Sequence, residues 1–366
     1  MNLELSDDQR MLKDSVDRLV AERYDVDQRR GYIALPDGWS RDMWSAFAEL
    51  GLMMLPFSED QGGLGLGGVE TMLVGEAFGR GLVAEPYLPS VVLAGTAISQ
   101  GATPAQAQEW LPGIMGGETV GALVTEGTIE CRRDGSDWAL DGMARVVLGA
   151  DSATLLVVPA GDALFVVPAD APGMHRRGYR LHGGGGAADL TLAGVRVRQD
   201  HRLGGKGGLT RALEAGIAWL AAEATGAMQA ALDLTVDYLK TREQFGKPIA
   251  VNQSLQHRAA EMLVEVEEAR SAAMYAALLA QECDDHVRAT GYSAVKAVIG
   301  KAGRFVAQNA VQLHGGIGVS EEHVISHYFR RLTAIAMTLG DTESHLVRLA
   351  ALGGFTSATP HFDTSA

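Results

Sequence analysis

The chain has 366 residues, of which 47% are hydrophobic and 21% are charged. This composition is typical of globular proteins, and the length suffices for about two or three packed domains. The 31 basic and 45 acidic residues give a net charge of −14, which disfavours nucleic acid and anionic membranes as partners. No apolar run approaches the ~18 residues that cross a bilayer, and the first residues are acidic where a secretory signal is basic. We therefore expect a soluble, cytoplasmic protein.

Residues 1–118 are predicted to form a helical domain. Residues 5–20 repeat apolar side chains three and four apart behind the capping residues Ser6 and Asp7, which is typical of an amphipathic helix. Further helical windows follow, separated by glycine-rich turns; they cover residues 42–50, 69–79, 88–100 and 104–111.

The pattern changes after residue 118. Between 119 and 205, short segments rich in β-branched and apolar residues recur about ten residues apart, which predicts a small β domain. From 206 to 352, long alanine-rich windows return to the helical period and predict a helical bundle. Residues 353–366 are predicted to be a flexible tail.

The two cysteines, Cys131 and Cys283, suggest no site of their own. They have neither the number nor the spacing of a disulfide framework or a metal site, and no catalytic Cys/His pattern surrounds them. We therefore expect no bound metal and no cysteine nucleophile.

Two segments of the C-terminal region are unusual. Residues 241–249 read Thr-Arg-Glu-Gln-Phe-Gly-Lys-Pro-Ile and separate two long helical windows. Alone they fit a connector in which Arg242 complements the helix dipole, a contribution of ~0.3–1 kcal/mol. Residues 312–318 read Gln-Leu-His-Gly-Gly-Ile-Gly, and glycines after a helix let the backbone approach a ligand closely. A helix C-cap explains only one of these glycines.

In this order, and with strands upstream, the two segments resemble the acyl-CoA dehydrogenase family, which carries an Arg-x-x-Phe-Gly motif and a Gln-x-x-Gly-Gly-x-Gly motif. The similarity extends over nearly the whole chain, from the opening Leu-Ser-Asp-Asp-Gln to Thr125-Glu126 in the β domain and Gln253 after the first motif. The resemblance implies an α+β, mostly α fold with an N-terminal helical domain, a middle β domain and a C-terminal four-helix bundle. It also implies FAD-dependent α,β-dehydrogenation of an acyl-CoA thioester, with electron-transfer flavoprotein as the acceptor.

Transferred residue by residue, the resemblance implies a set of flavin contacts. Arg242 and Phe245 would hold the pyrophosphate and adenine of FAD, with Gln253 near the same dinucleotide. Guanidinium suits a pyrophosphate, and glycine amides suit anionic oxygens. The set is completed by Thr125 in the β domain and by Gln312, Gly315 and Gly316, which would reach the FAD of a neighbouring subunit. Such sharing implies an oligomer, either of identical subunits or with a homologous large subunit.

Several positions depart from the family where catalysis is expected. After Thr125-Glu126 a typical member supplies proline, glycine and Gly-Ser-Asp around the flavin and the acyl-CoA, whereas this chain reads Gly-Thr-Ile-Glu-Cys-Arg-Arg. The family's Trp-Ile-Thr/Ser segment on the flavin corresponds to residues 147–149, Val-Leu-Gly. An arginine usual early in the first C-terminal helix is absent. Flavin and thioester contacts are therefore depleted.

The catalytic base departs as well. Removal of the α-proton needs a carboxylate that faces the flavin, and most members supply it from a Glu-Gly-Thr motif, some from the first C-terminal helix. The helix position falls on Gly216, and counting forward from Arg331 places the motif's base at Gly340. Counting back from the last helix places it at Asp341, our candidate for the base. The alternative role for Asp341 is a helix N-cap.

Several segments along the chain look most like the small subunits of two-component acyl-CoA dehydrogenases of the pimeloyl-CoA dehydrogenase type; they read Lys-Asp-Ser-Val-Asp-Arg at 13–18, Gly-Trp-Ser at 38–40, His-Tyr-Phe-Arg-Arg-Leu at 327–332 and Leu-Gly-Asp at 339–341. That resemblance implies a partner chain that supplies an intact base. Two alternatives remain open. One is a family member with another flavin oxidation, such as nitroalkane oxidation, and the other is a non-catalytic scaffold that completes its partner's FAD site.

Overall fold

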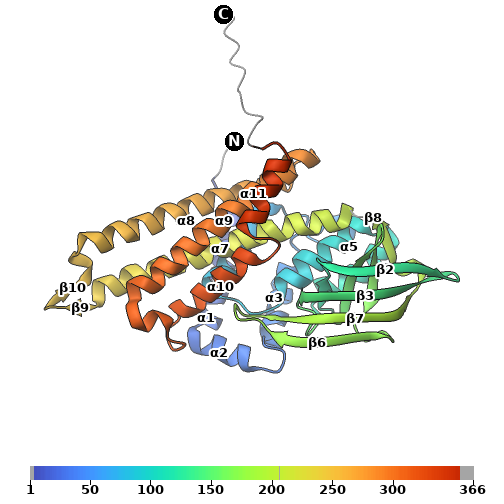
Figure 1. The fold of residues 1–366 in the computed structure, drawn as a ribbon, viewed down its shortest axis with the longest axis horizontal. Coiled ribbons are helices and arrows are strands. Elements are labelled where there is room, and N and C mark those ends of the chain that lie inside the picture. Colours follow the sequence, from blue (N-terminus) through green and yellow to red (C-terminus); the bar gives the residue numbers. More distant parts are fainter. Residues whose placement is uncertain (1–3, 206, 355–366) are drawn as a thin grey trace, which may run out of the picture.

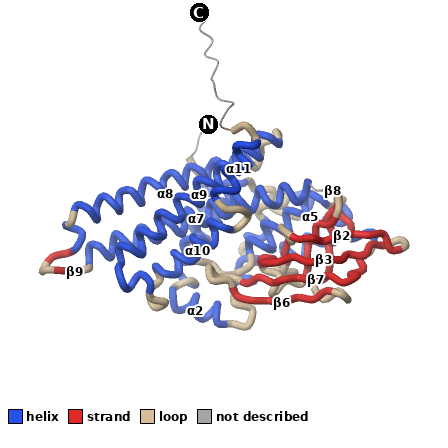
Figure 2. The backbone as a smooth tube through the Cα atoms, in the orientation of Figure 1, coloured by secondary structure: helices blue, strands red, loops and turns tan. Residues whose placement is uncertain are grey.

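The computed structural model describes residues 4–205 and 207–354. The molecule is elongated, with long helices at one end and a β domain at the other (Figure 1). Figure 2 shows the same division, with nearly all strands gathered at one end. The predicted class, mostly helical with a middle β domain, is confirmed.

The N-terminal region is helical, as the sequence predicts. Its α-helices are α1 (Asp7–Arg23), α2 (Val26–Ala34), α3 (Arg41–Glu49), α4 (Gly68–Gly81), α5 (Thr96–Gly101) and α6 (Pro104–Met115), and a π-helix, η3 (Leu88–Gly95), leads into α5. Capping boxes start α1 at Ser6 and α2 at Asp25, where side chain and backbone satisfy each other's free groups. The sequence analysis missed α2, whose apolar residues follow no helical period.

The β domain is built from two four-stranded sheets, ordered β1-β4-β5-β8 and β2-β3-β7-β6. The strands are β1 (Gly121–Leu123), β2 (Gly127–Asp134), β3 (Asp137–Leu148), β4 (Leu155–Ala160), β5 (Ala163–Pro168), β6 (Met174–Arg180), β7 (Gly186–Val197) and β8 (Arg202–Gly205). Strands β3 and β7 have 12 residues each, and their pairing is irregular near Gly142. These sheets enclose a core of their own, which includes Leu140, Val158 and Phe165.

The C-terminal bundle consists of α7 (Gly207–Thr241), α8 (Gln253–Leu279), α9 (Asp285–His314) and α10 (Ile325–Met337), followed by α11 (Thr342–Ala351). A small hairpin, β9 (Glu243–Gln244) and β10 (Lys247–Pro248), links α7 to α8. The bundle shares one hydrophobic core with the N-terminal helices. At their junction Trp219 of α7 stacks on Tyr87, with ring centroids 4.5 Å apart.

Helix α7 is the axis of the arrangement, because it begins beside α5 and the β domain and ends at the hairpin on the far side of the bundle (Figure 1). None of the helices in the described ranges combines the length and apolar character needed to cross a bilayer. Of the predicted tail, residues 355–366 lie outside the described residues.

Candidate functional site

Six of the residues assigned to FAD lie together at the end of the bundle that is remote from the β domain; they are Arg242, Phe245, Gln253, Gln312, Gly315 and Gly316. We call them the bundle-end surface. Arg242 follows α7, Gln253 begins α8, and the last three stand at the end of α9. Tyr238 of α7 stacks on His314 of α9 with ring centroids 4.5 Å apart. This contact joins the two motifs into one surface.

The hairpin of the first motif presents an aromatic ring to solvent in a strained conformation. Its two-residue loop is Phe245-Gly246, and both residues have positive φ, 55° and 77°, as a type I′ turn requires. An aromatic residue in the left-handed region costs roughly 1–3 kcal/mol. The Phe245 side chain is nevertheless 99% exposed, so no packing within the chain offsets the strain.

The second motif leaves its backbone open. Gly315 ends α9 with φ of 67°, and its N–H donates to the carbonyls of Gln312 and Val311. A Cβ built on Gly315 or Gly316 meets no atom within 4 Å. A flat or anionic group can therefore reach the backbone at this surface, and the guanidinium of Arg242 is exposed beside it. These features fit the adenine and pyrophosphate end of FAD.

Thr125, the seventh residue assigned to FAD, lies at the other end of the molecule. It is half-buried between β1 and β2. Gly216, near the start of α7, is 25 residues before Thr241, or about 38 Å at 1.5 Å per residue. The β domain that carries Thr125 and the bundle-end surface therefore lie at opposite ends of the molecule (Figure 1).

Asp341 lies in the loop between α10 and α11, where it caps α11. Its Oδ1 accepts the N–H of Ser344 at 2.8 Å, and this bond lowers the pKa of the exposed carboxyl group. The ammonium of Lys296, fully buried on α9, donates to the carbonyls of Ala336 at 3.0 Å and Gly340 at 2.7 Å. Burial lowers the pKa of Lys296 to about 8. Capping is shown for Asp341, and its role as a base stays a prediction.

The residue of this loop that faces the start of α7 is Leu339. A Cβ placed on Gly216 would lie 2.6 Å from Leu339 Cδ1 and 2.7 Å from Leu93 Cδ2. Leu339 has a φ of 58°, so its backbone is held in the left-handed region at this contact. Gly216, the helix position at which the resemblance would place a base, therefore lies in an apolar contact beside the loop that contains Gly340 and Asp341. The sequence analysis missed Leu339, although aligning Gly340 with the glycine of Glu-Gly-Thr would have found it.

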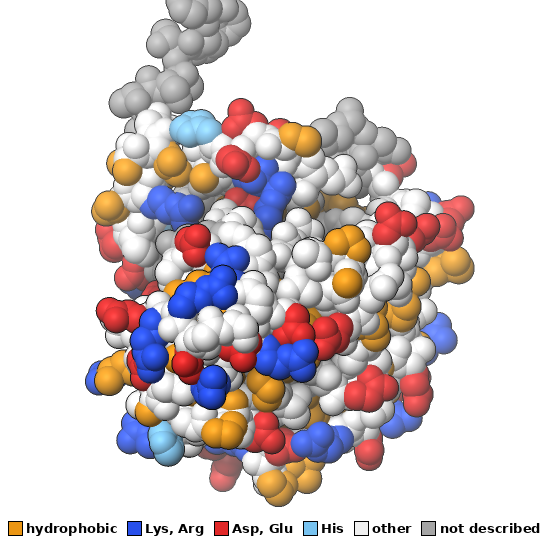
Figure 3. Space-filling model, turned by 90° about the vertical axis from the view of Figure 1, so that its right-hand side faces the viewer, with side chains coloured by type: hydrophobic (Ala, Val, Ile, Leu, Met, Phe, Trp, Pro, Cys, Tyr) orange, Lys and Arg blue, Asp and Glu red, His pale blue; other side chains and the backbone are white. Residues whose placement is uncertain are grey.

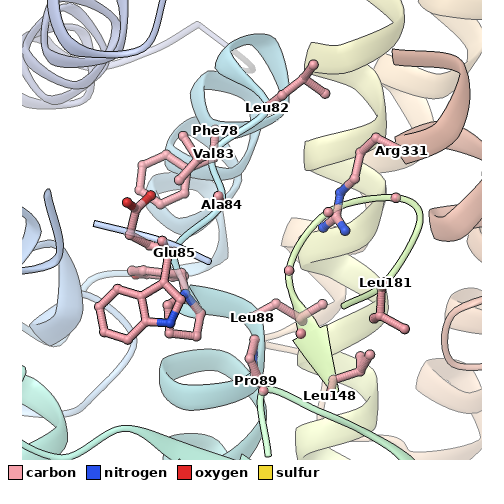
Figure 4. A pocket seen from close by; sticks show the side chains of 18 of the residues that line it. Phe78, Leu82, Val83, Ala84, Glu85, Leu88, Pro89, Leu148, Leu181 and Arg331 are labelled. Atoms are coloured by element: carbon pink, nitrogen blue, oxygen red, sulfur yellow. The ribbon is translucent and has the colours of Figure 1, made fainter. Parts of the chain in front are cut away.

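Little room remains between α7, the 82–89 segment and the β domain. The cavity there has a volume of about 70 Å³, against ~300–1,000 Å³ in ordinary ligand pockets. Figure 4 shows Arg331 and Glu85 on opposite sides of it, with Leu88, Pro89, Leu148 and Leu181 nearby. Arg331 pairs with Glu223 at 2.5 Å. The stacked Tyr87 and Trp219 rings also line this space, which is too small for a flavin ring beside a thioester.

The segment after Thr125-Glu126 also differs from a ligand-binding loop. Residues 127–134 form β2, paired along its length with β3 from Gly127 opposite Ala144 to Asp134 opposite Asp137. The backbone groups of β2 that face β3 are therefore engaged, although β2 is an edge strand of its sheet. The end of the molecule near the β domain, where the flavin ring would bind, therefore lacks the loop expected from the family, whereas the bundle-end surface is open.

Comparison with known proteins agrees with this geometry. Residues 206–352 match the model of the acyl-CoA dehydrogenase C-terminal domain, and residues 6–118 match that of the N-terminal domain. Acyl-CoA dehydrogenase FadE12 of Mycobacterium tuberculosis is 31% identical over 343 residues, covering 85% of this chain and 88% of the relative. Acyl-CoA dehydrogenase FadE27 of the same organism is 28% identical over 362 residues, covering 91% and 94%.

Solved structures show the same fold. A chain of the ChsE4–ChsE5 complex from Mycobacterium tuberculosis has a TM-score of 0.90 at 26% identity and covers 98% of this chain and 100% of its own. A variant of the Tcur3481–Tcur3483 steroid ACAD has a TM-score of 0.87 at 28% identity, with coverage of 95% and 98%. The similarity therefore spans all three parts of the chain.

Proposed function

The chain belongs to the acyl-CoA dehydrogenase family, whose members are FAD-dependent oxidoreductases that act on acyl-CoA, and we propose that it works as one subunit of a heteromeric acyl-CoA dehydrogenase. In this proposal a homologous partner holds the flavin ring, the thioester and the catalytic carboxylate. This chain supplies the bundle-end surface to the adenine and pyrophosphate of that flavin.

The bundle-end surface has the chemistry that this role needs. The Arg242 guanidinium pairs with pyrophosphate oxygens through charge-assisted hydrogen bonds. The exposed Phe245 ring offers a flat face to adenine, and the open backbone at Gly315 and Gly316 accommodates anionic oxygens. When bound, FAD supplies the acceptor for the hydride that leaves the β-carbon of the thioester.

The observation that carries the proposal is the apolar contact of Leu339 and Leu93 with Gly216. An α-proton can be removed only by a base within hydrogen-bonding reach in a site that holds the substrate. This chain has leucines at that contact. The cavity lined by Glu85 and Arg331 measures about 70 Å³, and a larger one of about 300 Å³ is lined by Val92, Ala215 and Trp219. The chain lacks the residues expected around the flavin ring but keeps those expected at the adenine and pyrophosphate. Both facts are explained if the flavin ring is held by the partner chain and this chain contacts only the other end of that flavin.

The heteromeric arrangement has support from a relative. The ChsE4–ChsE5 complex, similar in fold over 98% of this chain, is named after two components. We propose the same kind of assembly here, consistent with the resemblance to the small subunits of the pimeloyl-CoA dehydrogenase type. Electron-transfer flavoprotein is the proposed acceptor.

The competing arrangement keeps the base in this chain, with Asp341 in that role. It would require the exposed carboxylate to leave its hydrogen bond with the Ser344 N–H and turn toward the contact with Gly216. Glycine at 340 permits such a change of backbone, since its φ is already 95°. The two arrangements differ in which chain loses activity when its carboxylate is removed.

The test is to purify the chain alone and together with a homologous chain that carries a Glu-Gly-Thr motif. We expect FAD to be retained at about one per pair of unlike chains, and an acyl-CoA to bleach the flavin only in the mixed complex. Replacing the partner's motif glutamate by glutamine should abolish bleaching without loss of FAD. Bleaching of flavin bound to this chain alone would refute the heteromeric proposal.

A further inference from the structure

A second cavity, separate from the flavin-ring end, lies where α2, α10 and the turn between β6 and β7 meet. Its volume is about 230 Å³. The lining includes three arginines, Arg29, Arg180 and Arg330, together with the glycine turn 183–185. Such a collection is unusual in a chain whose net charge is −14.

Arg29 is the cation in this cavity that lacks a counterion. Its side chain is 7% exposed. Nε donates to the carbonyl of Leu82 at 2.8 Å, and Nη1 lies 3.0 Å from His327 Nδ1. The other ring nitrogen of His327 lies 3.0 Å from the Glu321 carbonyl, so it carries the proton while Nδ1 accepts from Arg29, and the imidazole is neutral. Within the described ranges no carboxylate forms an ion pair with Arg29.

The other arginines around the cavity are balanced. Arg180 pairs with Asp151 at 2.8 Å, and Arg330 pairs with Glu321 at 2.6 Å. Arg331, on the side toward the smaller cavity, pairs with Glu223 at 2.5 Å.

Glu85, which lines the smaller cavity together with Arg29, is engaged elsewhere. Its carboxylate accepts from the hydroxyl of Tyr24 and from the N–H of Ser40. One positive charge is thus left over, on a buried guanidinium, and buried charges are costly unless they are paired.

The glycine turn adds donors beside that charge. Gly183 lies so close to α10 that a Cβ would be 2.4 Å from Ala334 Cβ, and Gly184 and Gly185 have positive φ of 95° and 76°. A Cβ on Gly184 would lie 3.2 Å from Arg29 Nη2, which places this nitrogen against the turn. In the part of the chain that the structure describes, the N–H groups of Gly183 and Gly185 form no hydrogen bond with the protein. Between them, the N–H of Gly184 donates to the carbonyl of Leu181 at 3.1 Å. The turn therefore offers two free amides beside the guanidinium, and backbone amides in turns can bind anions.

We infer that this cavity binds a small oxyanion, a phosphate or a carboxylate group, with Arg29 Nη2 as the charged donor and the 183–185 turn as the second wall. The bound anion would supply the missing counterion of Arg29. It would also tie together α2, α10 and the β6–β7 turn, which come from the three parts of the chain. This inference is independent of the proposed heteromeric function, because it involves neither FAD nor the bundle-end surface.

The test is the binding of inorganic phosphate and of acetate to the purified protein by calorimetry, with sodium chloride at equal ionic strength as the reference. We expect binding of at least one of the two oxyanions above the chloride background, and the stronger one identifies the class. Arg29→Gln should weaken that binding by roughly tenfold or more, since a charged donor is removed. The matched control is Arg132→Gln on β2, where the arginine is 65% exposed, and it should bind like the wild type.

A measurement on the wild type covers the case in which Arg29→Gln does not fold. Crystals soaked in selenate should show an anomalous peak within hydrogen-bonding reach of Arg29 Nη2. The inference is overturned if no peak appears there, if oxyanions bind no better than chloride, or if a folded Arg29→Gln variant keeps the wild-type affinity.

Discussion

Lys296 offers a quantitative test of the packing beneath the loop between α10 and α11. Its ammonium is 0% exposed and is held by two carbonyl oxygens, those of Ala336 and Gly340. No carboxylate in the described ranges forms an ion pair with it, and burial lowers its pKa from 10.5 to about 8. We therefore expect the protein to become more stable in alkaline solution through this residue.

The sign follows from proton binding. Between the folded pKa of about 8 and the unfolded value of 10.5, the unfolded chain binds a proton that the folded chain has released, so the free energy of unfolding rises with pH. The full difference of about 2.5 pKa units corresponds to about 3 kcal/mol at ~1.36 kcal/mol per unit. From about pH 7.5 to about pH 9.5 the gain should be about 2 kcal/mol.

The assay is urea denaturation of wild type and Lys296→Met at several pH values in this range. The difference between the two free energies of unfolding removes the titration of all other groups. The matched control is Lys301→Met on the same helix, where the lysine side chain is 67% exposed and should add no alkaline stabilisation. If Lys296→Met gains stability with pH as steeply as the wild type, the buried ammonium is not the titrating group and the reasoning fails.

Three further outcomes follow from the site. Arg242→Ala should reduce the FAD content of the mixed complex, because it removes a charge-assisted contact of ~1.5–3 kcal/mol. The melting temperature should not fall, since Arg242 is exposed. Unchanged flavin absorbance would show that Arg242 does not contact FAD. Asp341→Asn keeps an oxygen that can cap α11 and should retain turnover with the partner present, whereas Asp341→Ala should lower the melting temperature; loss of turnover in Asp341→Asn at full FAD content would make Asp341 the base. Native mass spectrometry should give an assembly that contains both chains, and a monomer with stoichiometric FAD would contradict the shared site.

Hydrophobic periodicity in the sequence was sufficient to predict the helices and strands that bury a complete face. The long windows of the bundle and the buried strands β4 and β5 follow this rule. The strands β2 and β6 were missed because they are the two edges of the sheet β2-β3-β7-β6. Most of their side chains are exposed, with Ile129 the buried one in β2, so neither strand shows the alternation of a half-buried strand.

Helix α10 was missed for a different reason. Its apolar residues Ile325, Tyr328, Leu332 and Ile335 do recur at helical spacing and are buried. The sequence analysis uses residues 327–332 for the resemblance to small subunits and Arg331 to locate the base, and it assigns no helix there. Assigning the helix first, and letting it end at Met337, would have placed Leu339 in the following loop, whereas its contact with α7 is a feature of the tertiary structure.

What the sequence could not supply is the distance between the two motif groups. Local patterns identify Thr125 and Arg242 separately, but only the length of α7 shows that they stand at opposite ends of the molecule. The charge balance around Arg29 is similarly invisible in sequence, because its neighbours His327, Gly184 and Leu82 are remote along the chain. Both are consequences of tertiary packing.

The energetics of the two ends of α7 differ in a way that bears on the function. Near the start of α7, leucine side chains fill the space against Gly216, and burial of these apolar side chains stabilises the folded chain without a ligand. At the hairpin end, Phe245 remains in a strained conformation with its ring 99% exposed, at a cost of roughly 1–3 kcal/mol that nothing in the chain repays. Folding stability alone would favour a small or polar residue there. An exposed aromatic in this position is understandable if its contact is made with a cofactor carried by another chain, which is the arrangement that the heteromeric proposal requires.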